Sequence, residues 1–521
     1  MPPQRKPATS LNLPKGHKCL LPFLLFLITI ATRIPFTEKL LYHMDSVQYA
    51  LAIGHYDITV HQPHPPGYFL YVMLGRAAYA ITGDPHTALL SLSILFSALT
   101  VVAIYYLARE LHDDTCALMA ALLAITSPNL WFHGEVALNY VIEAFFSTVI
   151  ALLCWHIHRG KVRLVWLSAI ILAMTGGVRQ STAVFLFPLW LLAIRRLPLR
   201  TIITAVGLFV IASLCWFVPM VWMTGGLERY LGAFRELWLF TGGQASVFQG
   251  GWPTFKYYAS TVFIFTVYGI GGGIGILILR LYHGIRTRGL MELPREKVLF
   301  YLAWLLPPIL FHLLIFIQPA NPGYALIYLP PLLILVAASI CHTSTGTARF
   351  MAGNLSRPLF ALLICINLAI FFFAHSPVSY PALRKHDKDL AVILSGFSSF
   401  DSSSTALFID TFIFYGPRHL MYYLPDYATY MMDIRVAPTG ELRQIFYGIN
   451  GKTYISRQIN LPAGIKQFAT LKFTKPGSGG FPFIGLKVVH LAPEFSIVAG
   501  PIAQVERVYP DIKLVMPKIG G

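Results

Sequence analysis

The chain has 521 residues, of which 56% are hydrophobic and only 12% are charged, whereas a soluble domain carries about 25% charged residues. This composition leaves too little polar surface for a water-soluble globule, and several apolar runs approach the roughly 20 residues that cross a bilayer, so we predict a multi-pass membrane protein. The net charge of +17 does not indicate nucleic-acid binding, because Lys and Arg form short clusters between apolar runs, as in cytoplasmic loops under the positive-inside rule.

The first apolar run follows a basic N-terminal segment, residues 1–18, which we expect to be cytoplasmic. No small-x-small cleavage site follows this run, so we expect an uncleaved first helix rather than a signal peptide. Apolar runs of this kind recur along the chain and predict an all-α membrane module of about eleven transmembrane helices. The predicted spans are 19–36, 87–108, 116–130, 139–157, 164–178, 182–195, 201–222, 260–281, 298–317, 325–341 and 358–374.

The stretch 67–81 decides the predicted topology. It is short for a span and carries Arg76 in its middle. If it does not cross the membrane, nearly every basic cluster falls on the cytoplasmic side, and if it crosses, those clusters move outside, against the positive-inside bias. We therefore predict an interfacial or re-entrant helix on the outer face. The non-cytoplasmic segments are then 37–66, 131–138, 179–181, 223–259 and 318–324.

A polar tail follows the last predicted span and is near the size of a small domain. Ala406–Ile409 and Leu486–Leu491 are β-prone runs, and turn signals lie at Gly451, Gly464 and Gly477–Gly480. We predict an extracytoplasmic domain of mixed α/β or β-rich fold over this tail. The predicted domains are the N-terminus 1–18, the transmembrane module 19–374 and the C-terminal domain 375–521.

The first outer loop, residues 37–66, is dense in ionisable groups. Asp45 is the candidate general base, because a carboxylate within hydrogen-bond reach of an acceptor hydroxyl can take its proton as a group is transferred. The alternative is a solvated loop carboxylate. His64 precedes Pro65 and Pro66, which fix an extended backbone without explaining the histidine, so we retain His64 as a substrate-binding candidate. A divalent metal site is left open, because imidazole and carboxylate suit several metals. Its ligands would come from His55, Asp57 and His61 with Asp45.

The second outer segment carries three polar residues at helical spacing. Glu135, Asn139 and Glu143 stand at i, i+4 and i+8, which predicts that they line one face of a helix entering the membrane. Carboxylates inside a membrane are costly and indicate a functional site by default. The alternative is a structural hydrogen-bonded pair between helices.

Two further polar positions lie at predicted outer turns. Arg179 stands between two apolar runs, where a guanidinium suits a bidentate phosphate contact, the alternative being snorkelling to the interface. Asn321 and Tyr324 belong to a polar Pro/Gly break over residues 318–324. Such a break at membrane depth requires burial by protein or a cavity, so it is a candidate lining of a donor site, the alternative being an ordinary tight loop.

The chain contains the motifs Asp45-Ser46, His64-Pro65-Pro66-Gly67-Tyr68, Gly75-Arg76, SPNLWFHGEVALNY and NPGY with LPPLLIL. Together these motifs resemble the GT-C superfamily of integral-membrane glycosyltransferases. The chain looks closest to the RgtA/B/C/D-like group and to relatives of the protein O-mannosyltransferases, and the resemblance covers about residues 19–340. Two positions depart from the family pattern. Many relatives have an acidic residue where this chain has Ser46, and relatives often show Glu-Val-Tyr where it has Leu138-Asn139-Tyr140.

The resemblance implies a glycosyltransferase that uses a polyprenyl-phosphate-linked sugar and a first-loop carboxylate as base, here Asp45. Arg179 with Arg76 would offset charge on the leaving phosphate, and direct displacement would invert the anomeric centre. We expect a glycan, lipid or protein acceptor, the bilayer as partner, no nucleic acid and no certain cofactor. We expect it in a bacterial inner membrane, with its active site outside the cytoplasm. The alternatives are a lipid-linked glycan transporter or flippase and a non-catalytic membrane assembly subunit.

Overall fold

The computed structural model describes residues 19–238, 245–286, 294–341, 356–410, 412–436, 442–447, 453–455, 458–473, 485–509 and 513–515. The predicted N-terminal segment 1–18 and the predicted turns at Gly451 and Gly477–Gly480 lie outside these residues. The chain divides into two compact units. The first takes in Met1–Thr37 and Pro66–Ala382, and the second takes in Glu38–Pro65 and Leu383–Gly521. The tail and most of the first predicted outer loop therefore belong to the same unit.

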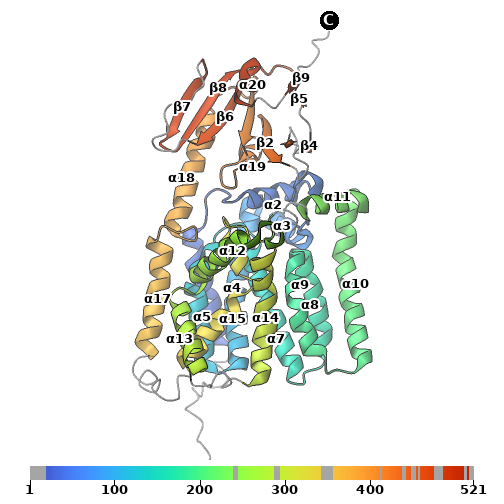
Figure 1. The fold of residues 1–521 in the computed structure, drawn as a ribbon, viewed down its shortest axis with the longest axis vertical. Helices are drawn as coiled ribbons and strands as arrows, with labels where there is room; N and C mark the ends of the chain where they lie inside the picture. The colour runs from blue at the N-terminus through green and yellow to red at the C-terminus, as the bar shows by residue number, and fades with distance from the viewer. Residues whose placement is uncertain are drawn as a thin grey trace, which may run out of the picture. The chain divides into compact units, whose positions relative to one another are not determined.

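The first unit is a bundle of helices, several of which run side by side (Figure 1). Side-chain caps explain some of the boundaries: Asp84 accepts a hydrogen bond from the N–H of Thr87 at 2.7 Å, and Asp113 accepts one from Cys116 at 2.8 Å. The helices are α1 (Leu20–Arg33), η2 (Ile34–Phe36), α3 (Phe69–Thr82), α4 (Pro85–Leu111), α5 (Asp114–Thr126), α6 (Pro128–His133), α7 (Tyr140–His158), α8 (Leu164–Val178), α9 (Gln180–Ile194), α10 (Leu199–Met223), α11 (Leu227–Trp238), α12 (Val247–Ile270), α13 (Gly273–Arg286), α14 (Arg295–Leu314), η6 (Pro322–Ala325), α15 (Leu329–Cys341) and α17 (Ser356–Phe373).

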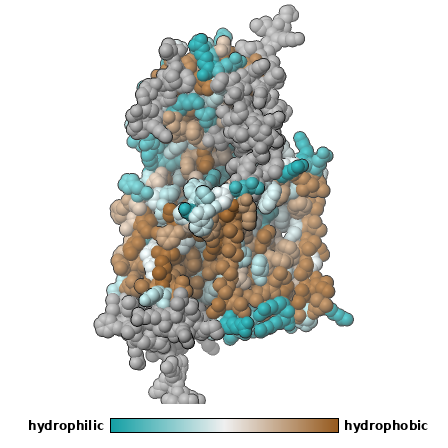
Figure 2. All heavy atoms as spheres, in the orientation of Figure 1, coloured by the Kyte–Doolittle hydropathy of each residue, from teal (hydrophilic) through white to brown (hydrophobic). Residues whose placement is uncertain are grey.

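The helices of this unit carry the predicted membrane character, and Figure 2 shows a broad hydrophobic band over them. Among the described residues, five helices are long and apolar enough to cross a membrane, and one bent pair, α12 with α13, passes the same test. Shorter apolar helices make up the rest of the bundle. The five long helices are α4, α7, α10, α14 and α17. The prediction of a largely helical multi-pass module is confirmed.

Two predicted spans differ from the helices in the structure. The predicted span 260–281 is broken, because α12 ends at Ile270 and α13 leaves it at 111°. Gly271 makes the break with φ of 52°, a left-handed conformation that favours glycine. The predicted span 116–130 ends early, since α5 stops at Thr126 and Pro128 starts the short helix α6, as proline readily does.

The second unit is built on a mixed β-sheet, which confirms the predicted α/β character of the tail. Within the described residues the order is β4-β3-β2-β1-β6-β8-β7, with β1 parallel to β2 and β6 and the other pairs antiparallel. β1 and β7 coincide with the two predicted β-prone runs. The strands are β1 (Thr405–Asp410), β2 (Ala428–Val436), β3 (Leu442–Tyr447), β4 (Thr453–Ile455), β5 (Gln458–Asn460), β6 (Gln467–Phe473), β7 (Lys487–Ala492), β8 (Phe495–Pro501) and β9 (Lys513–Val515), of which β5 and β9 pair separately.

Alternating residues of β1 build a hydrophobic core on each face of this sheet, as the period of two requires. Phe408 packs with Tyr430 and Val505 on one face, and Leu407 packs with Ile393 and Leu420 on the other. The helices of this unit are α2 (Met44–Gly54), η3 (Ile58–Val60), α18 (Tyr380–Phe397), α19 (Pro417–Tyr423), η9 (Ile502–Gln504) and α20 (Val505–Val508).

Backbone hydrogen bonds tie the segment Glu38–Pro65 to the rest of its unit. The N–H groups of Lys39 and Leu40 both donate to Asp387 Oδ1 at 3.0 Å. Leu41 donates to Tyr423 Oη at 2.9 Å, and its carbonyl accepts from His419 Nε2 at 3.0 Å. The segment that carries Asp45 is therefore held by α18 and α19, which follow it by more than 300 residues in sequence.

Candidate functional site

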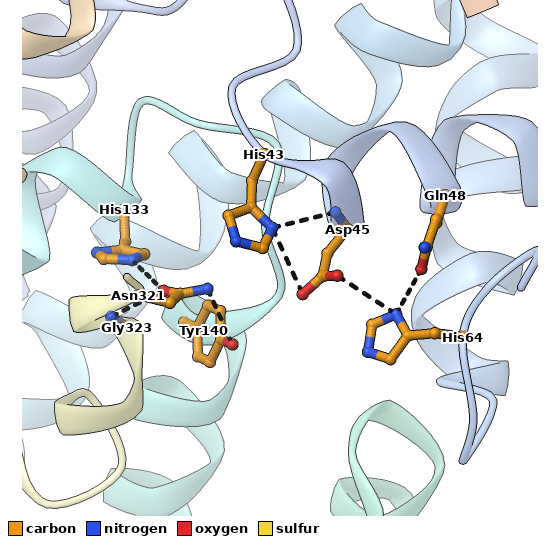
Figure 3. Close-up of polar contacts among 8 residues, drawn as sticks. All are labelled: His43, Asp45, Gln48, His64, His133, Tyr140, Asn321 and Gly323. Carbon is orange, nitrogen blue, oxygen red and sulfur yellow. Dashed lines mark hydrogen bonds and ion pairs between the residues drawn. The ribbon is translucent and has the colours of Figure 1, made fainter. Parts of the chain in front are cut away.

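Asp45 lies in the first turn of α2, and its backbone is fixed by the preceding histidine. His43 is the N-cap residue, and its Nδ1 accepts a hydrogen bond from the N–H of Asp45 at 3.1 Å. The same Nδ1 lies 3.5 Å from Asp45 Oδ2. Burial lowers the pKa of His43, which agrees with an unprotonated Nδ1 that can accept. The carboxylate of Asp45 therefore lies beside a neutral imidazole (Figure 3).

The other oxygen of the carboxylate faces His64. His64 Nδ1 lies 3.6 Å from Asp45 Oδ1 and 2.8 Å from Gln48 Oε1. Because an amide oxygen can only accept, His64 Nδ1 donates to Gln48 Oε1, whereas Asp45 Oδ1 is too distant from Nδ1 for a hydrogen bond. Gln48 is buried and stands one helical turn after Asp45. Figure 3 shows the two imidazoles on either side of the carboxylate, which is 17% exposed.

The other ionisable residues of this loop do not join Asp45. Asp57 caps the helix η3 instead, accepting from the N–H of Thr59 at 2.9 Å and from its hydroxyl at 2.7 Å. His55 ends α2, and His61 ends η3 in a left-handed conformation. Across the described ranges, no group of three or more His, Cys, Asp or Glu side chains is placed to hold a metal ion. The residues named for a metal site thus have separate structural positions.

The helical unit contains a second polar cluster, centred on Glu143 and Arg179. Arg179 stands at the junction of α8 and α9, and its Nη1 donates to Glu143 Oε1 at 2.7 Å. Thr182, in the first turn of α9, donates its hydroxyl to Glu143 Oε2 at 3.0 Å. The Arg179 and Glu143 side chains are only 11% and 4% exposed. Glu143 is therefore paired between helices, with Arg179 and Thr182 as its partners.

Two tyrosines flank the guanidinium of Arg179. Its central carbon lies 4.8 Å from the ring centroid of Tyr140 and 4.7 Å from that of Tyr324. Both distances are within cation–π range. No other hydrogen bond from this guanidinium is formed with a described residue, so most of its five N–H donors remain for a ligand.

Asn321 connects the polar break at residues 318–324 to α7. Its Nδ2 donates to Tyr140 Oη at 3.1 Å, and its Oδ1 accepts from the N–H of Gly323 at 3.1 Å, as Figure 3 shows. His133 Nε2 lies 3.4 Å from the same Oδ1. A Cβ at Gly323 would lie 2.5 Å from the Tyr140 ring, so glycine is needed for this close approach. The structure thus joins three of the predicted residues, Asn321, Tyr324 and Arg179, through Tyr140.

The predicted common face of Glu135, Asn139 and Glu143 is wrong. Gly134 ends α6, residues 134–139 form turns, and α7 begins only at Tyr140. Glu143 consequently lies in the first turn of α7, and Asn139 is its N-cap residue. The i, i+4, i+8 spacing has no consequence here because no continuous helix contains all three positions.

Glu135 contributes to a separate buried cluster that the sequence did not indicate. It accepts a hydrogen bond from Trp131 Nε1. Arg33, fully buried at the end of α1, donates to the carbonyl of Ile125 at 2.9 Å and lies 4.5 Å from the Trp131 ring centroid. Arg33, a basic residue near the end of the predicted span 19–36, is the one sequence feature that could have indicated this cluster.

The remaining predicted residues are less informative. Arg76 lies half-buried on α3, the helix predicted over 67–81. Asn139 is buried, and neither atom of its amide has a hydrogen-bond partner in the described part of the chain. Gln48, Tyr140 and Thr182 complete the two clusters and were missed, because polar residues near predicted helix starts are common and carry no distinguishing signal.

Comparisons with known proteins agree with this architecture. Residues 63–222 match the sequence model of the dolichyl-phosphate-mannose-protein mannosyltransferase family. No curated protein sequence matches the chain.

The structural neighbours include ArnT from Cupriavidus metallidurans bound to undecaprenyl phosphate, with a TM-score of 0.56, 12% identity, and coverage of 92% of this chain and 97% of that chain. The apo state of ArnT gives a TM-score of 0.55, 13% identity, and coverage of 93% and 98%. The oligosaccharyltransferase AglB from Archaeoglobus fulgidus, in complex with an inhibitory peptide and a dolichol-phosphate, gives a TM-score of 0.45 and 11% identity, with coverage of 88% of this chain and 70% of that chain. The fold shared with ArnT extends over nearly the whole chain, including the tail. Together with the family match, it confirms the predicted resemblance: this chain has the fold of the GT-C superfamily of integral-membrane glycosyltransferases.

Proposed function

We propose that the chain is a membrane glycosyltransferase that moves a sugar from a polyprenyl-phosphate-linked donor to an acceptor hydroxyl on the extracytoplasmic face. The observation that carries this proposal is the Asp45 carboxylate, fixed in the first turn of α2 between the imidazoles of His43 and His64. A carboxylate held in this way is suited to general base catalysis. The likeness to the GT-C fold supports the same reaction class.

In the proposed reaction Asp45 takes the proton of the acceptor hydroxyl while the oxygen of that hydroxyl forms a bond to the anomeric carbon of the donor sugar. The bond from that carbon to the carrier phosphate breaks, the phosphate leaves with the electron pair, and the anomeric centre inverts. His64 Nδ1 donates to Gln48 Oε1 and lies 3.6 Å from Asp45 Oδ1, so the imidazole is held beside the carboxylate. His43 is neutral and adds no positive charge that would weaken the base.

Arg179 is the proposed partner of the carrier phosphate. Preorganised cations stabilise charge that develops on a leaving group, and the guanidinium is held by Glu143, Tyr140 and Tyr324. Undecaprenyl phosphate bound to ArnT, a protein of similar fold, supports a donor of this class. Arg76 is proposed as a second contact to phosphate.

The proposal also concerns sidedness. Arg179 and Arg195 flank the 15-residue helix α9, so they lie about 24 Å apart along its axis. The basic residues near Arg195 indicate the cytoplasmic side, which leaves Arg179 on the extracytoplasmic side. We propose about eleven spans, the inner membrane of a bacterium, and an extracytoplasmic C-terminal domain. The acceptor is a glycan, lipid or protein.

The decisive experiment incubates membranes carrying wild-type or variant chain with a panel of radiolabelled polyprenyl-phosphate sugars and follows label into acceptor fractions. We expect Asp45→Asn to insert normally and to lose transfer by roughly 10²–10⁴-fold, the range of general base catalysis. Asp57→Asn is the matched control, because Asn also caps a helix and Asp57 lies in the same loop. Full turnover by Asp45→Asn would contradict the assignment of the base. Movement of labelled carrier across the bilayer without transfer would indicate a transporter.

Cysteine labelling tests the sidedness independently of activity. In a background without the six native cysteines, single cysteines at positions 45, 179 and 196 are labelled with an impermeant reagent in sealed, oriented membranes. We expect positions 45 and 179 to react from one side and position 196 from the other. Labelling of positions 45 and 196 from the same side would overturn the proposal.

A further inference from the structure

A cavity of about 380 Å³ lies between α7, α9 and α14. It is at the opposite end of α9 from Arg179, so it is separate from the cluster around Glu143. Its apolar wall includes Trp155 and Phe300, both of which are buried. Arg195, Arg196 and Arg295 also line it. The cavity thus combines an apolar wall with three guanidinium groups.

The neighbouring acidic residue offsets only part of the charge of these three arginines. Glu296 also lines the cavity and interacts electrostatically with Arg196, and its Oε2 is paired with His158 Nε2 at 3.1 Å. Within the described ranges none of the three arginines forms an ion pair with an acidic side chain. Arg295 is also the first residue of α14, where the free N–H groups and the helix dipole favour an anion. The cavity therefore favours a negatively charged group.

An apolar groove continues from the cavity along α9 and α14. The two hollows share Leu192, Arg195 and Leu299, and the groove measures about 490 Å³. Its other lining residues are Pro188, Leu191, Leu302, Ala303, Leu306 and Pro307. Leu302 and Leu306 are each 43% exposed on a helix that is long and apolar enough to span a membrane. A hydrocarbon chain suits such a surface.

We propose that this cavity and groove bind one phospholipid with an anionic headgroup. The headgroup phosphate lies against Arg195, Arg196 and Arg295, and an acyl chain occupies the groove between α9 and α14. Arginine suits phosphate because its planar fork can bind two oxygens, and basic pockets between transmembrane helices recognise anionic headgroups. The occupant is a lipid rather than free phosphate, because the apolar groove is continuous with the cavity that the three arginines line. This inference does not depend on the proposed glycosyl transfer.

Native mass spectrometry of the purified full chain tests the proposal. The protein in detergent is titrated with phosphatidylglycerol, which is anionic, or with phosphatidylcholine of the same acyl chains, whose headgroup is neutral overall. We expect the wild type to retain a single phosphatidylglycerol molecule at least tenfold more tightly than phosphatidylcholine. Equal retention of the two lipids would overturn the proposal.

Variants distinguish lipid binding at this cavity from attraction of the lipid to basic residues elsewhere on the protein. R195Q/R196Q/R295Q should lower phosphatidylglycerol retention to the phosphatidylcholine level. K161Q/R163Q/R200Q, which removes three charges that do not line the cavity, should retain it like the wild type. A303F keeps the guanidiniums but fills the groove, so it should also lose the lipid. Wild-type retention by R195Q/R196Q/R295Q or by A303F would contradict the site. So would displacement of the lipid by millimolar glycerol phosphate, which would indicate a plain phosphate site.

Discussion

Glu143 on α7 and Arg179 at the start of α9 form an ion pair, with 2.7 Å between Oε1 and Nη1. Both side chains are almost fully shielded from solvent. A buried pair is stabilising only when the remaining lone pairs and protons are also satisfied. Thr182 supplies one further hydrogen bond to Glu143, and two tyrosine rings cover the guanidinium. The pair therefore joins three helices and holds a cation whose other donors are unused by the described residues.

Removing the carboxylate should destabilise the helical unit. Glu143→Gln leaves a buried guanidinium without its counterion, a change that costs about 3–5 kcal/mol in buried pairs. Thermal unfolding of the detergent-solubilised chain should show a clearly lower midpoint. The double variant Glu143→Gln/Arg179→Gln should recover part of the loss, because neither charge is then left alone. An unchanged midpoint in the single variant would show that the pair is not buried as described.

Replacing the guanidinium by an ammonium should affect transfer more than stability. Arg179→Lys keeps the positive charge for Glu143 but loses the planar fork and the stacking on Tyr140 and Tyr324. We expect sugar transfer to fall by about 100-fold, the usual cost of one preorganised donor. The unfolding midpoint should change little. Arg196→Lys, at the other end of α9, is the control and should transfer like wild type. Wild-type transfer by Arg179→Lys would remove this residue from the proposed phosphate site.

Asp387 on α18 should control the position of Asp45. Its Oδ1 accepts hydrogen bonds from the N–H groups of Lys39 and Leu40, and these residues precede α2. Asp387→Ala removes both bonds, whereas Asp387→Asn keeps an accepting oxygen. We expect Asp387→Ala to lower kcat about tenfold, the equivalent of two weak hydrogen bonds, and to speed amide hydrogen exchange over residues 38–46. Asp387→Asn should be near wild type in both measurements. Equal behaviour of the two variants would show that the hydrogen bonds do not position the loop.

The parts of the fold that depend on local sequence were predicted well. Apolar runs gave the helices, and the β-prone runs at Ala406–Ile409 and Leu486–Leu491 became β1 and β7, because hydropathy and β-propensity are properties of a short window. The break at Gly271 was missed, because the glycine run Gly271–Gly273 lies inside an apolar span, where small residues also favour the packing of helices. In the structure this glycine lies where a Cβ would clash with Asn367 of α17, a contact that no local pattern reveals.

The candidate site was predicted as a set of residues but not as an arrangement. Asp45, Arg179 and Glu143 were identified because they are charged residues in or beside apolar segments, where a charge is costly and therefore stands out in a sequence. Their partners Gln48 and Tyr140 were not identified, because an uncharged polar side chain at such a position does not stand out in this way. The anchoring of the Asp45 segment by Asp387 joins residues 348 positions apart in sequence. A single sequence carries no signal for a contact of that separation.

The C-terminal unit should lose stability as the pH falls below about 6.5. His386 is buried on α18, where its Nε2 donates to the carbonyl of Phe414 at 3.0 Å. Burial lowers the pKa of His386 to about 4, although Asp389 nearby opposes this shift. Burial also lowers the pKa of His419. Between pH about 4 and 6.5 the unfolded chain therefore binds protons that the folded unit does not, so stability falls as the pH drops through this window.

Hydrogen exchange of the sheet amides, corrected for the intrinsic effect of pH, measures this loss. We expect full protection at pH 7.5 and a loss of up to roughly 3 kcal/mol from His386 alone toward pH 4. His386→Asn keeps a donor for the Phe414 carbonyl and removes the titration, so its protection should depend less steeply on pH. Some dependence should remain, because His419 still titrates. Protection that rises with acidity, or an equally steep dependence in His386→Asn, would show that His386 is not held neutral in the folded unit.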